Sequence, residues 1–209
     1  MNLNYEAMLE YVHNVLVQNE GIKSPKPQLS FRNRFEHIKR VYGWAKRIIK
    51  GVDDCDESLV FTATIFHDCG YVKNRKDSHA KLGAEIFEKY ALENKFDKDF
   101  INKVSYMIKN HSNKSLLKED NTPIEFIILL EADLMDEEGA MGLVFDLLAE
   151  GTKLPESYST VFNEIMIHSA HILEQDFMVT PLAVKFWNEK KKFINDFINN
   201  LKFDLFMEY

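Results

Sequence analysis

The feature that most constrains this chain is an apolar run, Phe61 to Phe66, which ends in His67 and Asp68. The run has helical spacing, and an imidazole and a carboxylate are costly to leave in an apolar segment unless a partner satisfies them. A divalent cation is one such partner, because both groups are good metal ligands. The alternative is a helix end where a polar pair happens to lie, with Gly70 as its C-cap. The His-Asp pair alone favours this alternative, so a metal site needs support from other residues of the chain.

Length and composition narrow the class of protein. The chain has 209 residues, 45% of them hydrophobic, so we expect one globular domain with a substantial core. The net charge of -7 argues against a nucleic-acid polymer or an anionic membrane as partner. The two cysteines, Cys55 and Cys69, form no Cys-x-x-Cys motif. With no signal segment at the N-terminus and no apolar run of the ~20 residues that a membrane span needs, we expect a cytoplasmic protein.

Apolar residues recur at helical spacing almost everywhere and no alternating strand pattern stands out, so the sequence predicts an all-α fold. The first two helices are expected at 4–19 and 33–50. A capping box at Asp54 and Glu57 opens the third helix, which carries His67 and Asp68. Further helices start near Ser78, after Asp97, at Thr122-Pro123, at 138 (to 149), at 156 (to 175) and at Thr180-Pro181, with a polar loop at 73–77.

Four polar residues lie inward or at helix ends within these apolar elements. They are His37, His67, Asp68 and Asp133. His37 shares a helix face with Val41 and other apolar residues, and Asp133 ends a helix that is apolar nearly all round. Two imidazoles and two carboxylates on three helices can hold one divalent ion and leave positions open for water and substrate. The alternative is a buried polar pair of His37 and Asp133 without metal.

The order His37, His67-Asp68, Asp133 resembles the H…HD…D signature of the HD-domain metal-dependent phosphohydrolases. The flanks are similar too, as in Ile65-Phe66-His67-Asp68-Cys69-Gly70 and Glu131-Ala132-Asp133. The resemblance implies a single compact helical bundle over 1–209, with an HD-like core at about 33–145. The N-terminal helix at 4–19 and the C-terminal helices at 156–207 would pack on this core.

The resemblance also implies a site. His37, His67, Asp68 and Asp133 would bind a divalent ion, whether manganese, iron, magnesium, cobalt, nickel or zinc. Asp68 would orient the attacking water and Arg34, one turn before His37, would clamp a phosphate. Residues expected to contact the substrate or a second metal are His79, His111, Arg40, Lys73 and Asp136. The substrate would be a small phosphorylated molecule, with a nucleotide favoured.

Some features depart from the family or leave alternatives open. Tyr71 stands where many members have lysine, and no Gly-Tyr-Pro motif follows His111, which argues against a cyclic-dinucleotide phosphodiesterase. The stretch 133–142 resembles a small bacterial subgroup that hydrolyses nucleotide pyrophosphates. The sequence leaves open which bond is cut: that of a phosphomonoester, a pyrophosphate or a dinucleoside polyphosphate. A non-catalytic nucleotide sensor, a metal-free helical interaction module, and a homodimer contact through the last helix also remain open.

Overall fold

The computed structural model describes residues 3–24, 26, 29–71, 78–151, 153 and 157–207. The helices are α1 (Tyr5–Gln18), α2 (Arg34–Ile48), α3 (Glu57–Phe66), α4 (His79–Glu93), α5 (Lys98–Asn110), α6 (Ile124–Glu137), α7 (Ala140–Gly151), α8 (Tyr158–His168) and α9 (Pro181–Phe206). Short 3-10 turns lie between them: η2 (Ile49–Gly51), η3 (Lys114–Lys118) and η4 (Ala170–Glu174). Over these residues, pairing of the β type is limited to an isolated bridge between Lys23 and Asn33. The predicted all-α fold is confirmed.

Most predicted helix starts are confirmed by a capping contact. The side chain of Ser78 accepts a hydrogen bond from the amide of Lys81, and Asp97 caps α5 in the same way. The capping box at Asp54 is wrong, because α3 begins one residue after Asp56, whose carboxylate accepts from the amide of Ser58 at 2.9 Å. Asp54 has a left-handed backbone, with φ of 53°, and lies outside the helix.

Other boundaries also differ from the prediction: α6 begins after Pro123, its N-cap, and the helix predicted at 138–149 is α7, at Ala140–Gly151. Helix α3 ends at Phe66, so that His67 is its C-cap and the metal-type pair lies just beyond the helix. The stretch predicted as one helix at 156–175 is α8 followed by η4. The predicted polar loop at 73–77 lies outside the described residues.

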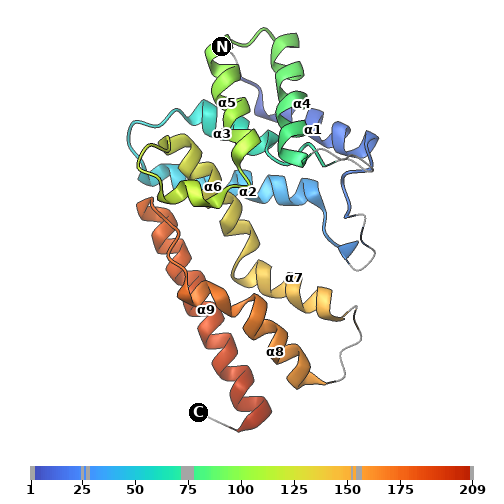
Figure 1. Ribbon diagram of the computed structural model, residues 1–209, viewed down its shortest axis with the longest axis vertical. Coiled ribbons are helices and arrows are strands. Elements are labelled where there is room, and N and C mark those ends of the chain that lie inside the picture. Colours follow the sequence, from blue (N-terminus) through green and yellow to red (C-terminus); the bar gives the residue numbers. More distant parts are fainter. Residues whose placement is uncertain are drawn as a thin grey trace.

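Two buried helices form the centre of the molecule. Every residue from Leu59 to Phe66 in α3 and from Phe126 to Asp136 in α6 is buried. This is what a helix that is apolar nearly all round requires. Helix α2 packs extensively on α6, and α4 packs in the same way on α5. Figure 1 shows α1 to α5 gathered in the upper part of the molecule, with α6 leading from them toward α7.

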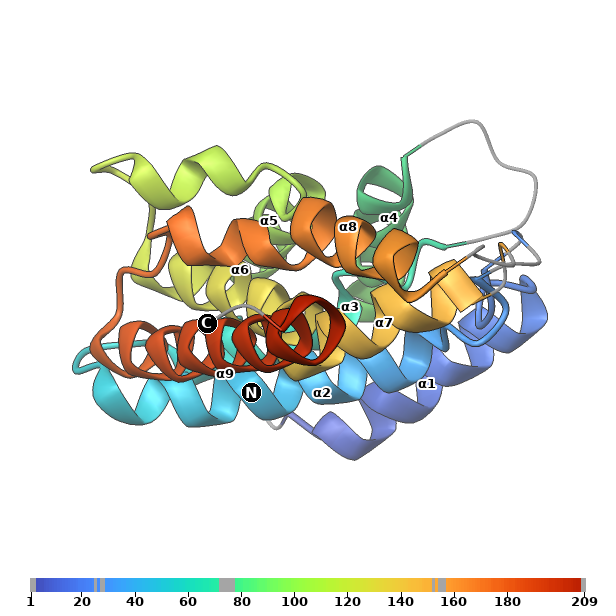
Figure 2. The same ribbon diagram turned by 90° about the horizontal axis from the view of Figure 1, so that it is seen from below.

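The three C-terminal helices α7, α8 and α9 lie side by side (Figures 1 and 2), and in Figure 1 they lie below this group. They are tied to the centre through Glu131 of α6, which is fully buried. Its Oε1 accepts from the amides of Val179 and Thr180 at 2.5 and 2.8 Å, and its Oε2 accepts from the Thr180 hydroxyl at 2.7 Å. Because α9 has no side-chain cap of its own, this carboxylate satisfies amides at its start.

Gly70 lets α4 lie directly against the turn that follows α3. A Cβ at Gly70 would fall 2.0 Å from the carbonyl oxygen of His79 and 2.4 Å from the amide nitrogen of Gly83. Gly70 does not have a left-handed backbone, so it is needed for this close approach and does not act as a left-handed C-cap. The approach brings His79, the first residue of α4, next to the His67-Asp68 turn. Within the described ranges, no helix combines the length and the apolar character that a bilayer crossing needs.

Candidate metal centre

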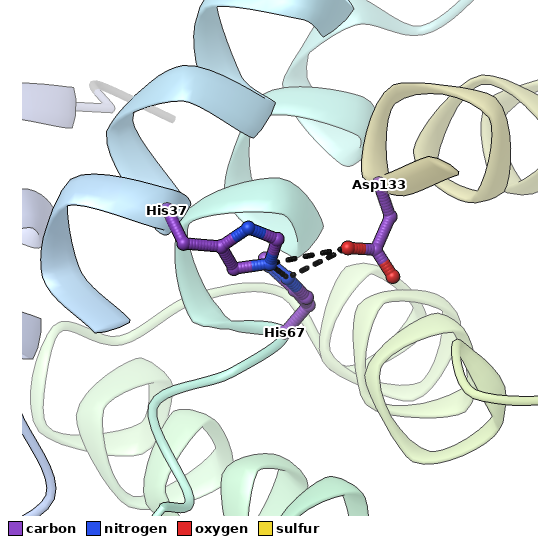
Figure 3. A group of neighbouring side chains, drawn as sticks. All are labelled: His37, His67 and Asp133. Carbon is purple, nitrogen blue, oxygen red and sulfur yellow. Dashed lines mark hydrogen bonds and ion pairs between the residues drawn. The ribbon is translucent and has the colours of Figure 1, made fainter. Parts of the chain in front are cut away.

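His37 of α2, Asp133 of α6, and the pair His67-Asp68 that directly follows α3 are all buried and lie together. Figure 3 shows how His37, His67 and Asp133 point toward one another. His37 Nε2 lies 3.2 Å from Asp133 Oδ1 and 3.4 Å from Asp68 Oδ2. His67 Nε2 lies 3.3 Å from His37 Nε2 and 3.6 Å from Asp133 Oδ1. Nitrogens and oxygens that converge in this way without apolar atoms between them match the ligand set of a divalent ion.

The histidine rings are held so that Nε2 points into the cluster. The Nδ1 atoms of His67 and His111 lie 2.7 Å from the carbonyl oxygens of Thr64 and Ile108, three residues earlier in the chain. His37 Nδ1 lies 2.7 Å from Asp136 Oδ2. Carbonyl and carboxylate oxygens only accept, so Nδ1 carries a hydrogen, and in the neutral ring, the form that binds a metal, the lone pair lies on Nε2. This is the arrangement in which metal-binding histidines are held.

The electrostatics favour a cation at this point. Burial by itself would lower the pKa of His37, yet its carboxylate neighbours, led by Asp133 and Asp136, raise it to about 9. Burial would raise the pKa of Asp68, but His67 and Arg34 hold it well below its usual range. The buried carboxylates keep their negative charge and lie close together, so positive charge between them is stabilising.

A second group of ligand atoms adjoins the first. His67, Asp68 and His111 have one donor atom each within 4.8 Å of one another, as do His37, His67 and Asp133. Asp68 faces both groups, because its Oδ1 lies 3.3 Å from His111 Nε2 and 3.5 Å from His79 Nε2. The two predicted accessory histidines therefore lie beside Asp68, on the side away from His37.

Arg34 is buried and is bound to the cluster. Its Nη1 donates to Asp68 Oδ2 at 2.7 Å, and its guanidinium lies 3.8 Å from the centre of the Tyr71 ring. Tyr71 in turn stacks on His79, with ring centres 4.2 Å apart. The residue that departs from the family pattern thus forms an aromatic link between Arg34 and the accessory histidines.

Asp136 and Arg40 lie outside the ligand cluster. Asp136 is buried beside the Nδ1 edge of His37, and Arg40 donates to its carboxylate through Nε at 2.7 Å and Nη2 at 3.0 Å. The three residues form a chain that ends on a ligand-type histidine. Asp136 and Arg40 therefore lie where they can hold the ring of His37 in a fixed orientation. Lys73 lies outside the described residues.

Sequence reasoning missed Lys114. Its Nζ lies 2.5 Å from Asp133 Oδ2, and Lys114 and His37 are among the groups that hold the pKa of Asp133 well below its usual range. The one available signal was its position three residues after His111, directly behind a helix end that carries a ligand-type residue. The structure thus adds a second cation, after Arg34, that touches a carboxylate of the cluster.

Glu164, His168 and His171, which are spaced at i, i+4 and i+7 in the sequence, do not form a further group of metal ligands. His168 pairs with Glu164 at 3.3 Å, whereas His171 pairs at 3.0 Å with Glu138, the C-cap of α6. Among the described residues, both groups of buried ligand atoms that could hold a metal ion lie in the cluster around His67: His37, His67 and Asp133, and His67, Asp68 and His111.

The fold and the site define the class: an all-helical protein with a buried His/Asp cluster that can hold a metal ion. The sequence profile of the HD domain matches residues 34–138, half of the 209-residue chain, and the chain belongs to the HD domain family. Membership of this family supports a metal-dependent hydrolase. Comparison with curated protein sequences finds no match.

Solved structures share the fold over nearly the whole chain. Bacillus subtilis YpgQ in complex with ADP has a TM-score of 0.68 and 20% identity, covering 96% of this chain and 94% of that chain. An HD-superfamily hydrolase from Bacillus thuringiensis has a TM-score of 0.71 and 16% identity, covering 96% of each chain. A predicted HD superfamily hydrolase from an uncultured Thermotogales bacterium has a TM-score of 0.64 and 21% identity, covering 96% and 92%. These likenesses concern the fold.

Proposed function

We propose that the protein is a metal-dependent phosphohydrolase that cleaves a phosphoester or phosphoanhydride bond in a small phosphorylated substrate, with a nucleotide as the favoured class. The observation that carries the proposal is the buried cluster in which histidine Nε2 atoms and two carboxylates converge. A helical interaction module has no use for such an arrangement, since the cost of burying these groups needs a compensating partner.

His37, His67, Asp68 and Asp133 would hold the ion, which could be manganese, iron, magnesium, cobalt, nickel or zinc. A divalent ion there lowers the pKa of a bound water and polarises a phosphoryl oxygen. His79 and His111, which face the other oxygen of Asp68, would hold a second ion or contact the substrate. These roles rest on position and donor chemistry.

The chain's own groups would do the positioning. Asp68 would orient the attacking water, because a carboxylate has acceptor sites to spare and Arg34 fixes its plane. Arg34 and Lys114 would place positive charge where the phosphoryl oxygens lie, which is the main demand of phosphoryl transfer. Arg34 suits the task because its planar fork matches phosphate oxygens.

A nucleotide is favoured for two reasons. Bacillus subtilis YpgQ, which shares the fold, was solved in complex with ADP. Two cations also lie beside a metal-type cluster, which suits a substrate that carries phosphate charge. The bond cut, whether a phosphomonoester, a pyrophosphate or a dinucleoside polyphosphate, follows from which products a substrate panel yields.

The test compares wild type with Asp68→Asn, and with Asp99→Asn as matched control, all purified without chelator. Asp99 is an exposed carboxylate on α5 that pairs with Lys103 and is not one of the cluster residues. Metal content is measured by mass spectrometry, and phosphate release is followed over a nucleotide panel with added manganese. We expect near-stoichiometric metal and turnover in wild type and the control, and loss of both in Asp68→Asn.

The outcomes separate the competing functions. Metal and nucleotide binding without turnover of any nucleotide would identify a non-catalytic sensor. Wild-type protein that takes up no metal when it is supplied would refute the phosphohydrolase and leave the polar core as structure.

A further inference from the structure

A cavity of about 500 Å³ lies beside the metal centre, between α2, the junction of α6 and α7, and the end of α8 with η4. Its volume is in the range of sites that bind small molecules. His37 belongs to both places: its Nε2 faces Asp133 in the cluster, and its ring also lines the cavity. Figure 1 shows α6 running from beside α2 to α7, and residues of α2, of the end of α6 and of α7 line the cavity. The cavity and the cluster are thus separated by little more than one side chain.

The charge of the cavity opposes phosphate. Its lining includes five carboxylates, Glu36, Asp136, Glu137, Glu138 and Asp146. Against them stand two guanidiniums, of Arg32 and Arg40, and three imidazoles, of His37, His168 and His171, so carboxylates outnumber the guanidiniums and the cationic His37 together. Both guanidiniums are already paired within it, Arg32 with Glu137 at 3.1 Å and Arg40 with Asp136. A phosphate group placed here would face excess negative charge, and the cations that contact the cluster, Arg34 and Lys114, do not line this cavity.

The apolar part of the lining suits a flat ring. Phe31, from the segment before α2, meets Phe145 of α7 edge to face, with ring centres 5.5 Å apart. Met141, Leu143 and Leu148 extend this wall along α7. Aromatic and aliphatic walls bind planar rings by stacking and burial. Carboxylates such as Glu138 have more acceptor sites than their present partners use, so N–H groups on the ring edge would be bound.

From these observations we infer that this cavity is the subsite for the ring end of the substrate: an uncharged, planar, nucleobase-like ring that carries N–H donors. The phosphate end would lie across His37, on the side of Arg34 and Lys114. The two sides differ in charge, so the substrate can lie in one direction only. This inference rests on the proposed function and deepens it by assigning the substrate's orientation.

The test measures the binding of adenosine to the 209-residue chain in the presence of chelator, by calorimetry or ligand-observed NMR. The variant is Leu148→Trp, which fills the cavity from a side chain that is 47% exposed and so does not disturb the core. The matched control is Leu147→Trp, the same change at the neighbouring position of α7, which is 36% exposed and does not line the cavity. Because the indole takes up the space of the ring, Leu148→Trp should weaken adenosine binding by about tenfold or more, while the control binds as wild type does.

Two further ligands test the ring chemistry. Ribose 5-phosphate has no ring base and should bind in chelator more weakly than adenosine. It makes no ring contact in the cavity, and without metal its phosphate meets the carboxylates of the cluster, which already pair with Arg34 and Lys114. Purine riboside lacks the amino group of adenosine and should bind several-fold more weakly. Equal binding of adenosine by the two tryptophan variants, ribose 5-phosphate that binds as well as adenosine, purine riboside that binds as tightly as adenosine, or no adenosine binding to wild type would each overturn the assignment.

Failure of this inference is distinguishable from failure of the proposed function. Adenosine binding is measured without metal and without turnover. Phosphate release from nucleotides with unaltered adenosine binding in Leu148→Trp would keep the phosphohydrolase and remove the subsite. Cavity-dependent adenosine binding without metal uptake would keep the subsite and remove the phosphohydrolase.

Discussion

Replacing Asp136 with asparagine tests whether the chain Arg40–Asp136–His37 prepares the metal site. The carboxylate accepts from His37 Nδ1 at 2.7 Å and from two nitrogens of Arg40 at 2.7 and 3.0 Å. An amide of the same shape keeps one accepting oxygen and turns an NH2 group toward a donor, either His37 or Arg40. It also removes the negative charge that makes these hydrogen bonds about twice as strong as neutral ones. His37 therefore loses its fixed orientation and part of its basicity.

The expected magnitude follows from the usual effect of removing such a partner, about 10- to 100-fold in metal affinity. This corresponds to about 1.4–2.7 kcal/mol. Manganese titration by calorimetry measures it, with circular dichroism to confirm the fold. Asp146→Asn is the matched control, since Asp146 lines the same cavity but accepts from Ser169 at 2.6 Å. Wild-type manganese affinity in Asp136→Asn would refute the idea that Asp136 positions His37.

Three other perturbations have clear expected results. Gly70→Ala places a methyl against backbone atoms at 2.0 and 2.4 Å, so urea unfolding should show a free energy of unfolding lower by about 3 kcal/mol or more. Gly43→Ala is the control: it lies in the interior of α2 with nothing within 4 Å of the added Cβ, so its free energy of unfolding should rise by about 0.5–1 kcal/mol. Similar urea midpoints for the two variants would contradict the close approach at Gly70. Gly139→Ala forces a φ of 72° on a residue with a Cβ, and its thermal midpoint should fall by the equivalent of about 1–2 kcal/mol; an unchanged midpoint would argue against this strain. When free metal is present at 100 times its dissociation constant, removing it with chelator should lower the free energy of unfolding by about 2.7 kcal/mol. The thermal midpoint of wild type should then fall in chelator, whereas that of Asp68→Asn should not change.

The residues of the cluster could be predicted because the reasoning did not depend on three-dimensional detail. His37 lies on the apolar face of its helix, and His67 follows an apolar run. A polar residue in such a setting must find a partner in the interior. Helices α2, α3 and α6 pack on one another, so their inward polar groups meet. His111, which the family resemblance indicated, also lies at the end of an amphipathic helix, as the C-cap of α5.

Other features could not be read from the chain because they depend on how separate elements meet. Asp136 lies one helical turn after Asp133, yet it faces His37 Nδ1 and not the cluster. Lys114 is a surface-type residue in sequence, and its contact exists only because η3 lies over the end of α6. The cap of α3 was misplaced by two residues because Asp54 and Asp56 offer the same local chemistry, and the backbone φ decides between them.

The carboxylate of Glu131 has a consequence for how the chain could be divided. The profile of the HD domain ends at residue 138, but the groups that satisfy Glu131 belong to residues 179 and 180. A fragment cut at the family boundary would keep a buried carboxylate two residues from Asp133 and remove every donor that the structure gives it. We therefore expect the smallest fragment that binds metal to extend at least to the first turn of α9, and an independently expressed 34–138 to need a substitution at Glu131 before it folds.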